Sequence, residues 1–414
     1  MKAVTMLLLG EPAFDYRVAK EAGTLVAAGY VVTIVCLPPD PRAGGPAQVG
    51  GATVIRRAAP RPLRMLARLR RARTHTRPEG GEQPGSRGPA EAPRQARGKK
   101  FLREARALVG TLWLNLVLAR VAARVPADYI HAHDLDALWA GKMTARRVQA
   151  RLIYDAHELY PDMLAHSSQL YNGFWRLIEH RLIRHARAVI TVNRVLAIEL
   201  RNRHRLPHLP AVVMNCPPLS PPPPPLERGD GTIGMLYLGA LLPERGLEGL
   251  LQALPHVDPR VILHVRGSGP LRSWLDAQAT IPGLQGRLIM HDPVPAERLA
   301  ATLAGMAIGV IPYVATSLNN YLCSPNKLFD YFMGGLAVVA SDLPEVRRDL
   351  VRRGAGLLYG HDDPTALADA INSLATDPAR LRAFQRSARL AAEEEFHWAN
   401  QAHVLLETYR MVTP

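Results

Sequence analysis

The segment from Ser324 to Asp342, SPNKLFDYFMGGLAVVASD, carries residue types that suit a phosphorylated ligand. Ser324 is a good helix N-cap and Pro325 suits the first helical position. A helix that begins here offers free backbone N–H groups to an anion, with Lys327 as a cation in its first turn. Asp330, one turn later, can accept hydrogen bonds from sugar hydroxyls. The pattern fits a diphosphate with a ribose attached, and an ordinary capped helix with a surface lysine has the same spacing.

Two short apolar runs end in a second group of reactive side chains. His133 ends the run 129–133, at the end of a predicted strand, where a ligand could reach it. The alternative for His133 is a structural histidine bonded to nearby backbone. His131 is expected in the core. The whole group could also bind a metal: His131, His133, Asp134, Asp155, His157 and Glu158. Asp134-Leu-Asp136 matches the short D-x-D pattern of metal-dependent transferases. We favour a site without a metal, with His157 and Glu158 lining an acceptor or bracing the loop.

Two glycine loops follow predicted strands in the second half of the chain. They are Gly239 to Gly246 and Gly267-Ser-Gly269. Neither matches the G-x-G-x-x-G pattern of dinucleotide-binding proteins, and the sequence contains no G-x-x-x-x-G-K-[ST]. An NAD-dependent enzyme is therefore disfavoured, and a P-loop nucleotide hydrolase is excluded.

The elements that position these residues alternate between buried strands and amphipathic helices. In the first half we expect strands at 3–9, 31–37, 129–133, 151–156, 188–192 and 211–214, and helices at 15–28, 101–125, 136–148, 173–186 and 194–204. In the second half we expect strands at 232–238, 261–265 and 355–359, and helices at 244–254, 364–376, 378–395 and 398–411. Strands apolar on both faces, separated by helices, are typical of parallel sheets covered by helices.

A proline-rich spacer separates the two halves, with proline at seven of the nine positions 217–225. We therefore predict an α/β protein of two doubly wound parallel-sheet, Rossmann-like domains facing across a cleft. The predicted limits are 1–215 for an acceptor-binding domain, 216–230 for the linker and 231–395 for a nucleotide-sugar domain, with a helix at 396–414 crossing back to the first domain. Two sheet edges that each bind a ligand favour a transferase over a hydrolase.

Composition bounds the class of protein. The 414 residues are 48% hydrophobic and 21% charged, which fits a globular protein and excludes general disorder, and no apolar run is long enough for a multi-span membrane protein. The apolar N-terminus is predicted to be the first strand and not a signal peptide. Three dispersed cysteines give no disulfide framework and no zinc spacing, so we expect a cytoplasmic protein.

The net charge of +15 is concentrated in one segment. Residues 56–106 hold 16 Lys and Arg against 4 Asp and Glu, a net charge of +12. We expect a disordered insertion at about 56–100. This segment has three possible roles. We favour a solubilising loop. Its arginines and leucines could also bind an anionic membrane surface, or the segment could bind a nucleic acid. Base stacking is unsupported because no aromatic residue stands among its arginines, so we expect no nucleic-acid partner.

Several of these segments together resemble the GT-B glycosyltransferases, specifically the large retaining family numbered 4. The segment SPNKLFDYFMGGLAVVASD looks like the donor-binding segment of that family, and YLGALLPERG at 237–246 is similar to its first strand and loop of the C-terminal domain. LHVRGSGP at 263–270, IHAHD at 130–134 and YDAHE at 154–158 resemble further strand ends, and Asp15 to Ala22 resembles an opening helix. The resemblance covers nearly the whole chain except the basic insertion and the linker.

The resemblance implies transfer of a sugar from a nucleotide diphosphate with retained configuration, without a metal or other cofactor. It implies catalytic roles for His133, near the donor sugar, and for Arg245 and Lys327, which would stabilise charge on the leaving diphosphate. The implied donor-binding residues are Gly239, Gly267, Asn320, Ser324, Asn326 and Asp330, and the implied acceptor-side residues are Arg17, His157 and Glu158. A solvent-facing arginine is the alternative for Arg17. The expected acceptor is a glycan or a lipid-linked or cell-envelope molecule, used in polysaccharide biosynthesis on the inner face of the cell membrane.

Two positions depart from the family pattern. Ala240 stands where the family usually has an arginine, and Leu322 stands at the first of two usual glutamates, where Asn319, Asn320 or Ser324 could replace its sugar contacts. A non-catalytic GT-B protein that binds nucleotide or glycan as a partner subunit is therefore the alternative to an active transferase.

Overall fold

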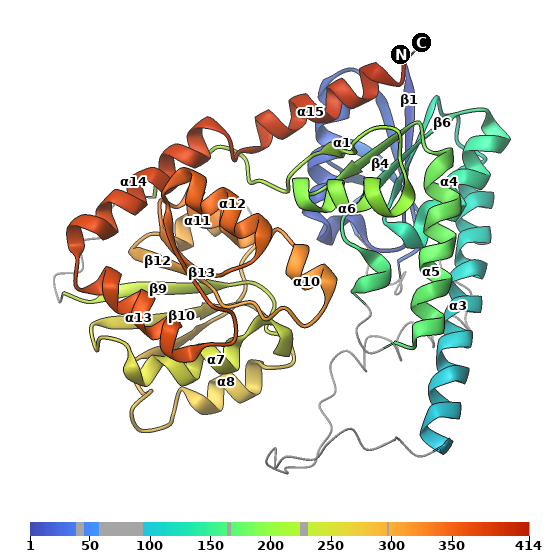
Figure 1. Cartoon of the computed structure of the whole chain (residues 1–414). Coiled ribbons are helices and arrows are strands. Elements are labelled where there is room, and N and C mark those ends of the chain that lie inside the picture. The colour runs from blue at the N-terminus through green and yellow to red at the C-terminus, as the bar shows by residue number, and fades with distance from the viewer. Residues whose placement is uncertain (39–44, 58–93, 164–166, 224–230, 296–297, 414) are drawn as a thin grey trace. The chain divides into compact units, whose positions relative to one another are not determined.

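The computed structural model describes residues 1–38, 45–57, 94–163, 167–223, 231–295 and 298–413. The chain forms two compact units, each with its own sheet (Figure 1). The first unit comprises Met1–Thr191, Glu199–Ala211 and Leu405–Pro414, and the second comprises Val192–Ile198 and Val212–Val404. Most of the predicted basic insertion, residues 58–93, and the end of the linker, residues 224–230, lie outside the described residues.

The first unit is built on an eight-stranded sheet in the order β3-β4-β2-β1-β5-β6-β7-β8. Its strands are β1 (Ala3–Leu8), β2 (Val31–Cys36), β3 (Gln48–Val49), β4 (Ala52–Arg56), β5 (Tyr129–His133), β6 (Arg151–Ala156), β7 (Ala188–Thr191) and β8 (Ala211–Val212). From β4 to β7 neighbouring strands are parallel, and the short β3 pairs antiparallel with β4. The central strands β1, β5 and β6 are buried on both faces, as expected for a parallel sheet covered by helices.

Within the described residues, the helices that belong wholly or partly to this unit are α1 (Tyr16–Ala27), α3 (Arg94–Ala122), α4 (Leu135–Val148), α5 (Gln169–Leu182), α6 (Arg194–His204) and α15 (Trp398–Met411). Asp15 caps α1 by accepting hydrogen bonds from the backbone N–H groups of Arg17 and Val18. The helix expected from residue 101 begins at Arg94, so the prediction of disorder up to residue 100 is wrong for 94–100. Arg, Gln, Ala and Lys there are good helix formers, which lets the helix extend toward its N-terminus.

The second unit is built on a six-stranded parallel sheet in the order β11-β10-β9-β12-β13-β14. Its strands are β9 (Ile233–Leu238), β10 (Val261–Arg266), β11 (Leu288–His291), β12 (Met306–Ile311), β13 (Ala337–Ser341) and β14 (Gly356–Tyr359). Alternate side chains enter separate cores on the two faces. Tyr237 packs into one core, and Leu236 packs into the other with Phe329 and Phe332.

The helices of this unit are α7 (Leu247–Ala253), α8 (Arg272–Gln278), α9 (Leu299–Thr302), α10 (Leu318–Leu322), α11 (Asn326–Met333), α12 (Pro344–Arg353), α13 (Pro364–Ala375) and α14 (Pro378–Glu394). Short 3₁₀ turns lie at Pro12–Phe14, Tyr160–Asp162, Ile183–His185, Pro243–Arg245 and Leu254–His256. The helix expected at 244–254 is therefore shorter, because Gly246, with φ of +70°, ends the turn before α7 begins.

The last helix, α15, contributes to both units. At its start Gln401 accepts a hydrogen bond from the backbone N–H of Met214, within the second unit. Near its end Tyr409 is fully buried in the first unit, where its hydroxyl lies 2.8 Å from Nδ1 of His131. The prediction of two doubly wound parallel-sheet α/β domains is confirmed, and the antiparallel β3–β4 hairpin is an element that the sequence analysis missed.

One segment of α3, Lys100–Ala122, is long and apolar enough to cross a membrane by its length and composition alone. About a third of its most apolar window, 33%, is buried inside the structure. Among the described residues it is the one helix that meets this test.

Candidate functional site

Two loops at the carboxyl edge of the second sheet are hydrogen-bonded to each other. The loop after β9 begins at Gly239, whose N–H donates to the carbonyl of Arg266, and the loop after β10 begins at Gly267. A Cβ on Gly267 would lie only 1.8 Å from the Gly239 carbonyl oxygen, so glycine is required at this close approach. Gly239 itself has φ of +122°, which L side chains rarely adopt. Glycine at both positions therefore lets the two backbones converge.

Lys327 points into this loop region from the first turn of α11. Its side chain is buried, with 5% exposure, and a Cβ at Gly239 would lie 3.6 Å from its Nζ. Nζ lies 3.6 Å from the ring centroid of Tyr237 and 4.9 Å from that of Tyr313. No hydrogen-bond acceptor for Nζ is present among the described residues. Burial, and then the charge of Arg245, lower the pKa of Lys327 well below its usual range. The amine therefore faces aromatic rings and lacks the acceptor that an ammonium group normally has.

Arg245 supplies a second cation. It ends the 3₁₀ turn Pro243–Arg245, and its guanidinium carbon lies 4.4 Å from the ring centroid of Tyr313. A planar guanidinium can bind a phosphate through two hydrogen bonds. Ser324 adds a buried hydroxyl with no hydrogen-bond partner among the described residues. The loop, two cations and an unpartnered hydroxyl together form an arrangement that suits a diphosphate.

The prediction that Ser324 caps the helix is wrong. The helix α11 begins at Asn326, Pro325 occupies the N-cap position, and no side chain makes a capping hydrogen bond. The reason is the extended backbone of Pro325, with ψ of 121°, which delays the helix by one residue. The Ser324 hydroxyl is therefore available to a ligand.

The remaining predicted donor residues occupy different environments. Asp330 is half-buried on the next turn of α11, and Asn326 is exposed at its start. Asn320, on α10, donates from Nδ2 to the hydroxyl of Thr316 at 2.8 Å. Ala240 is exposed and Leu322 is buried, so neither position of the family pattern carries a polar side chain here.

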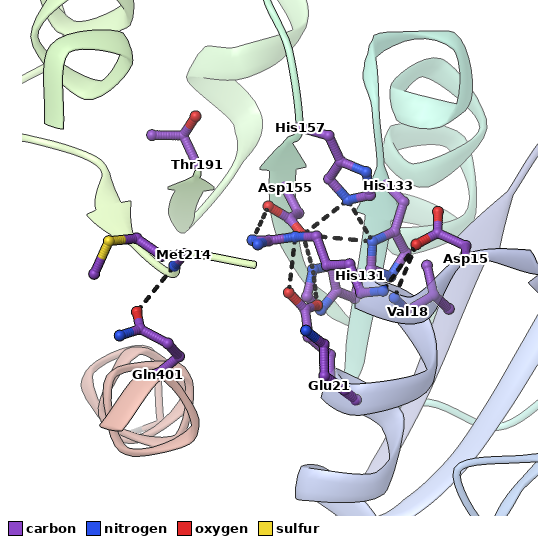
Figure 2. A network of polar contacts seen from close by, with 12 residues as sticks. Asp15, Val18, Glu21, His131, His133, Asp155, His157, Thr191, Met214 and Gln401 are labelled. Atoms are coloured by element: carbon purple, nitrogen blue, oxygen red, sulfur yellow. Dashed lines mark hydrogen bonds and ion pairs between the residues drawn. The ribbon is translucent and has the colours of Figure 1, made fainter. Parts of the chain in front are cut away.

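In the first unit, Arg17, Asp155 and Glu21 form a buried ion-pair cluster. Figure 2 shows Asp155 and Glu21 of this cluster, with the neighbouring histidines. Arg17 on α1 is 2% exposed, so the alternative of a solvent-facing arginine is wrong. Its Nε and Nη2 each donate to a different oxygen of Asp155 at 2.8 Å, and Nε also lies 3.1 Å from Oε1 of Glu21. Burial alone would raise the pKa of Asp155, but Arg17 and His157 hold it well below its usual range. Arg17 therefore neutralises a carboxylate that could not otherwise stay ionised in this core.

Three histidines extend the cluster toward the ends of β5 and β6. His131 is fully buried, as expected for a core residue, and stacks on His133 with ring centroids 4.4 Å apart. His133 Nδ1 lies 3.2 Å from Nε2 of His157. His157 Nε2 lies 3.1 Å from Asp155 Oδ2, and its Nδ1 lies 3.3 Å from Asp134 Oδ2. His157 thus braces the loop after β6, which is one of the two roles predicted for it.

The two carboxylates fix the protonation of His157. Burial would lower the pKa of His157, but carboxylates at both ring nitrogens raise it to about 10, so both nitrogens carry a proton at neutral pH. His133 Nδ1 lies 3.2 Å from Nε2 of His157 and 3.5 Å from Oδ2 of Asp155. Its other ring nitrogen, Nε2, has no hydrogen-bond partner among the described residues. This nitrogen can therefore bind a ligand.

The same cluster contains a set of possible metal ligands. Atoms of Glu21, His131, His133 and Asp155 lie within 4.8 Å of one another. However, Arg17 occupies both oxygens of Asp155 and one of Glu21, and a cation would lie beside this fixed positive charge. Burial, and then the charge of Asp155, raise the pKa of Glu21 to about 8. Arg17 therefore already supplies positive charge to these possible ligands.

The backbone beside this cluster is strained. Asp134, between β5 and α4, has φ of 62°, which is uncommon for a residue other than glycine. Its Oδ1 accepts a hydrogen bond from the backbone N–H of His157 at 3.2 Å, which fixes one loop to the other. Glu158, predicted on the acceptor side, is half-buried in the turn that follows.

Two family models match the chain, one on each half. A "Glycosyl transferase 4-like domain" matches residues 16–217, and "Glycosyl transferases group 1" matches residues 232–377. The chain belongs to the family 4-like glycosyltransferases. The resemblance predicted from the sequence is confirmed, and the glycosyl transferases group 1 match contains the loops and the lysine described above.

Curated relatives of this glycosyltransferase are distant. The D-inositol 3-phosphate glycosyltransferase of Xylanimonas cellulosilytica is 28% identical over 183 residues, which are 43% of this chain and 42% of that protein. The alpha-maltose-1-phosphate synthase of Mycobacterium tuberculosis is 25% identical over 346 residues, 75% of this chain and 85% of that protein. The first match thus spans less than half the length of that relative.

Solved structures share the fold over the whole chain. Sucrose-phosphate synthase from Thermosynechococcus elongatus has a TM-score of 0.72 with 18% identity and covers 100% of this chain and 99% of its own. The Anabaena HepE protein in complex with UDP-glucose has a TM-score of 0.71 with 15% identity and covers 100% of both chains. The lipopolysaccharide glycosyltransferase WaaG has a TM-score of 0.64 with 11% identity and covers 98% of both chains. Together with the two parallel sheets, these neighbours give the GT-B architecture.

Sequence reasoning missed four residues that shape the two sites. Tyr237 and Tyr313 surround Lys327, and their positions at or just beyond strand ends are the signal that was available. Glu21 and Tyr409 complete the buried cluster from α1 and α15. No sequence pattern links these last two, because they meet only through the packing of helices that lie far apart in the chain.

Proposed function

We propose that this glycosyltransferase moves a sugar, of hexose type, from a nucleoside diphosphate to a glycan, lipid-linked or other cell-envelope acceptor, and retains the anomeric configuration. The observation that carries the proposal is the buried Lys327 amine, which has no hydrogen-bond acceptor and lies beside Gly239. A diphosphate would give it that acceptor. The complexes of HepE with UDP and with UDP-glucose support a nucleotide sugar as the ligand, and make UDP-glucose the first donor to test.

The proposed chemistry breaks the bond between the anomeric carbon and the diphosphate oxygen. The electron pair stays on the diphosphate, and its developing charge is stabilised by Lys327, Arg245 and the N–H groups at the start of α11. The acceptor hydroxyl forms the new bond to the anomeric carbon, and its proton passes to the departing diphosphate oxygen. In the first unit, Nε2 of His133 would bind a sugar oxygen, with Arg17, His157 and Glu158 on the acceptor side.

No metal is needed in this scheme, because the protein supplies the cations. Arg245 and Lys327 serve the diphosphate, and Arg17 serves the buried carboxylates of the first unit. We further propose that the enzyme works in the cytoplasm, on the inner face of the cell membrane, in polysaccharide biosynthesis. The net charge of +12 within residues 56–106 supports attraction to an anionic membrane surface.

A panel of nucleotide sugars tests the function. Thermal shift and release of nucleoside diphosphate are measured together on the wild type, on Lys327→Met and on Lys142→Met, a control that removes a lysine from α4. The proposal predicts one donor that stabilises and is turned over in the wild type and the control but not in Lys327→Met, with turnover unchanged by a chelator. NMR of the product must show the anomeric configuration of the donor; the opposite configuration contradicts retention.

A non-catalytic partner subunit is the second candidate, because Ala240 and Leu322 replace polar residues of the family pattern. This candidate predicts that a donor binds and that binding depends on Lys327. It also predicts that no nucleoside diphosphate is released, whichever acceptor extract is added. Absence of binding to every nucleotide sugar would contradict both candidates.

A further inference from the structure

The helix α3 exposes several large apolar side chains. Phe101, Leu102, Val109 and Trp113 are 61%, 52%, 64% and 50% exposed. On the opposite side, the polar residues Glu104, Thr111 and Asn115 are 7%, 4% and 2% exposed. A helix on the surface of a water-soluble domain normally turns its apolar side chains toward the core. The outer face of α3 is therefore suited to contact with an apolar phase.

Hydrogen bonds fix the rotation of α3 about its axis. Asn115 Nδ2 donates to the carbonyl of Asp136 at 2.6 Å, and its Oδ1 accepts from the N–H of Ala140 at 2.8 Å, which ties α3 to α4. Glu104 accepts from both the N–H and the hydroxyl of Ser168, the N-cap of α5. These buried polar bonds hold the apolar face outward, and turning it inward would break them.

The charge of the surface selects among possible partners. The 29 residues of α3 contain seven Lys and Arg and one acidic residue, Glu104, which is buried against Ser168. Arg103 and Arg106 are exposed beside Leu102 and Val109. Exposed apolar side chains interleaved with cations are typical of helices that lie at the surface of anionic membranes.

The start of α5 extends this surface. Leu170, two residues after Ser168, is 77% exposed, and Arg176 is exposed one and a half turns later. Because Ser168 bonds to Glu104, the beginning of α5 lies beside the N-terminal half of α3, as Figure 1 shows. We define the docking surface as Phe101, Leu102, Val109, Trp113 and Leu170.

We propose that this docking surface inserts into the headgroup region of an anionic lipid bilayer, with α3 lying in the plane of the membrane. The bonds of Asn115 and Glu104 to the folded unit exclude a spanning helix, because crossing would strip these polar groups of their partners in hydrocarbon. The occupant is a lipid surface and not a second copy of the chain, since two copies would bring like charges together. This proposal rests on the proposed place of the enzyme at the membrane, and its test does not depend on sugar transfer.

Flotation with lipid vesicles tests the proposal. The full chain is mixed with vesicles of phosphatidylcholine alone or with added phosphatidylglycerol, and the partition coefficient is measured at low and high salt. The variant Leu102→Gln/Val109→Gln/Trp113→Gln removes the apolar face, and Val351→Gln/Leu390→Gln, two residues 61% and 52% exposed on the second unit, is the matched control. Circular dichroism and thermal melting establish that both variants fold.

We expect the wild type and the control to bind vesicles that contain phosphatidylglycerol, with affinity that falls at high salt. The face variant should bind about a hundredfold more weakly, because three large side chains no longer leave water. Trp113 fluorescence in the wild type should be quenched by brominated acyl chains, and Trp113→Phe should lose most of the quenching. The proposal would be overturned if the face variant bound vesicles as well as the wild type, or if the wild type did not bind. It would also be overturned if the wild type formed a dimer that the face variant does not form.

Discussion

Asp155 binds Arg17 through two hydrogen bonds of 2.8 Å each, in a part of the first unit where neither side chain reaches solvent. The two residues lie 138 positions apart and come from β6 and α1. Buried ions are costly to leave unpaired, so this pair holds the start of α1 against the carboxyl end of the sheet. The position of His133 and His157 depends on it, since both contact Asp155.

We expect Arg17→Met to lower the free energy of unfolding by about 3–5 kcal/mol, because it leaves a buried carboxylate without its partner. Urea unfolding measures the change. Arg260→Met is the matched control: it breaks an exposed pair with Asp258 and should change stability far less. The double variant Arg17→Met/Asp155→Asn should recover part of the loss. A loss equal to that of Arg260→Met would contradict the assignment.

The pH dependence of stability should report on His157. Its pKa in the folded protein is about 10, above the usual histidine value of 6.5, because Asp134 and Asp155 outweigh its burial. The folded state therefore holds a proton that the unfolded state loses, and the stabilisation is complete below pH 6.5 and is lost as the pH rises toward 10. We expect His157→Gln to flatten unfolding free energy against pH in this window. Exposed His208→Gln should leave the slope unchanged, and an unchanged slope in His157→Gln would refute the assignment.

NMR of ¹⁵N-labelled histidine can observe the proton on His133 directly. We expect hydrogen on Nε2 of His133 and an electron pair on its Nδ1, because Nδ1 faces the protonated Nε2 of His157 at 3.2 Å. In His157→Gln the two tautomers should mix, since the side-chain amide can rotate to donate or to accept. His133 with hydrogen on Nδ1 in the wild type would show that Asp155, 3.5 Å away, is its partner instead.

Donor binding should take up a proton at Lys327. Burial and Arg245 lower the pKa of this amine in the empty protein, and a bound diphosphate would raise it. Binding should therefore weaken as the pH rises through the pKa of the free amine, and calorimetry in buffers of different ionisation enthalpy should detect the proton. Lys327→Met should bind about ten- to a hundredfold more weakly and take up no proton. If Lys327→Met took up the same proton on binding, the proton uptake would belong to another group.

Gly239→Ala should weaken donor binding as well as stability. The new Cβ would lie 3.5 Å from Cε of Lys327, at a residue whose φ of +122° an L side chain rarely adopts. Gly283→Ala is the matched control, because it has φ of +92° with no atom within 4 Å of the added Cβ. Both variants should lose about 1–2 kcal/mol of stability from backbone strain. Only Gly239→Ala should lose affinity for nucleoside diphosphate, as measured by calorimetry. Equal affinities of the two variants would show that the loop at Gly239 is not part of the donor site.

Local patterns in the sequence determined most of the fold. The strands Tyr129–His133 and Arg151–Ala156 have the predicted limits, because short, mostly apolar runs between helices are typical of buried strands in a parallel sheet. The same patterns placed His133, Gly239 and Lys327 at strand and helix ends, where open sheets bind ligands. The β3–β4 hairpin was missed because its strands are short and its alternation of apolar residues is weak.

Only the tertiary structure decided how these residues acquire their properties. It buried Arg17 on Asp155 and Glu21, placed Tyr237 and Tyr313 around Lys327, and turned the apolar face of α3 outward. The physical reason is that charge, proton position and exposure depend on neighbours contributed by distant segments. The sequence by itself determined which side chains stand at the sheet edges; packing determined which of them are charged, which are unpartnered and which face solvent.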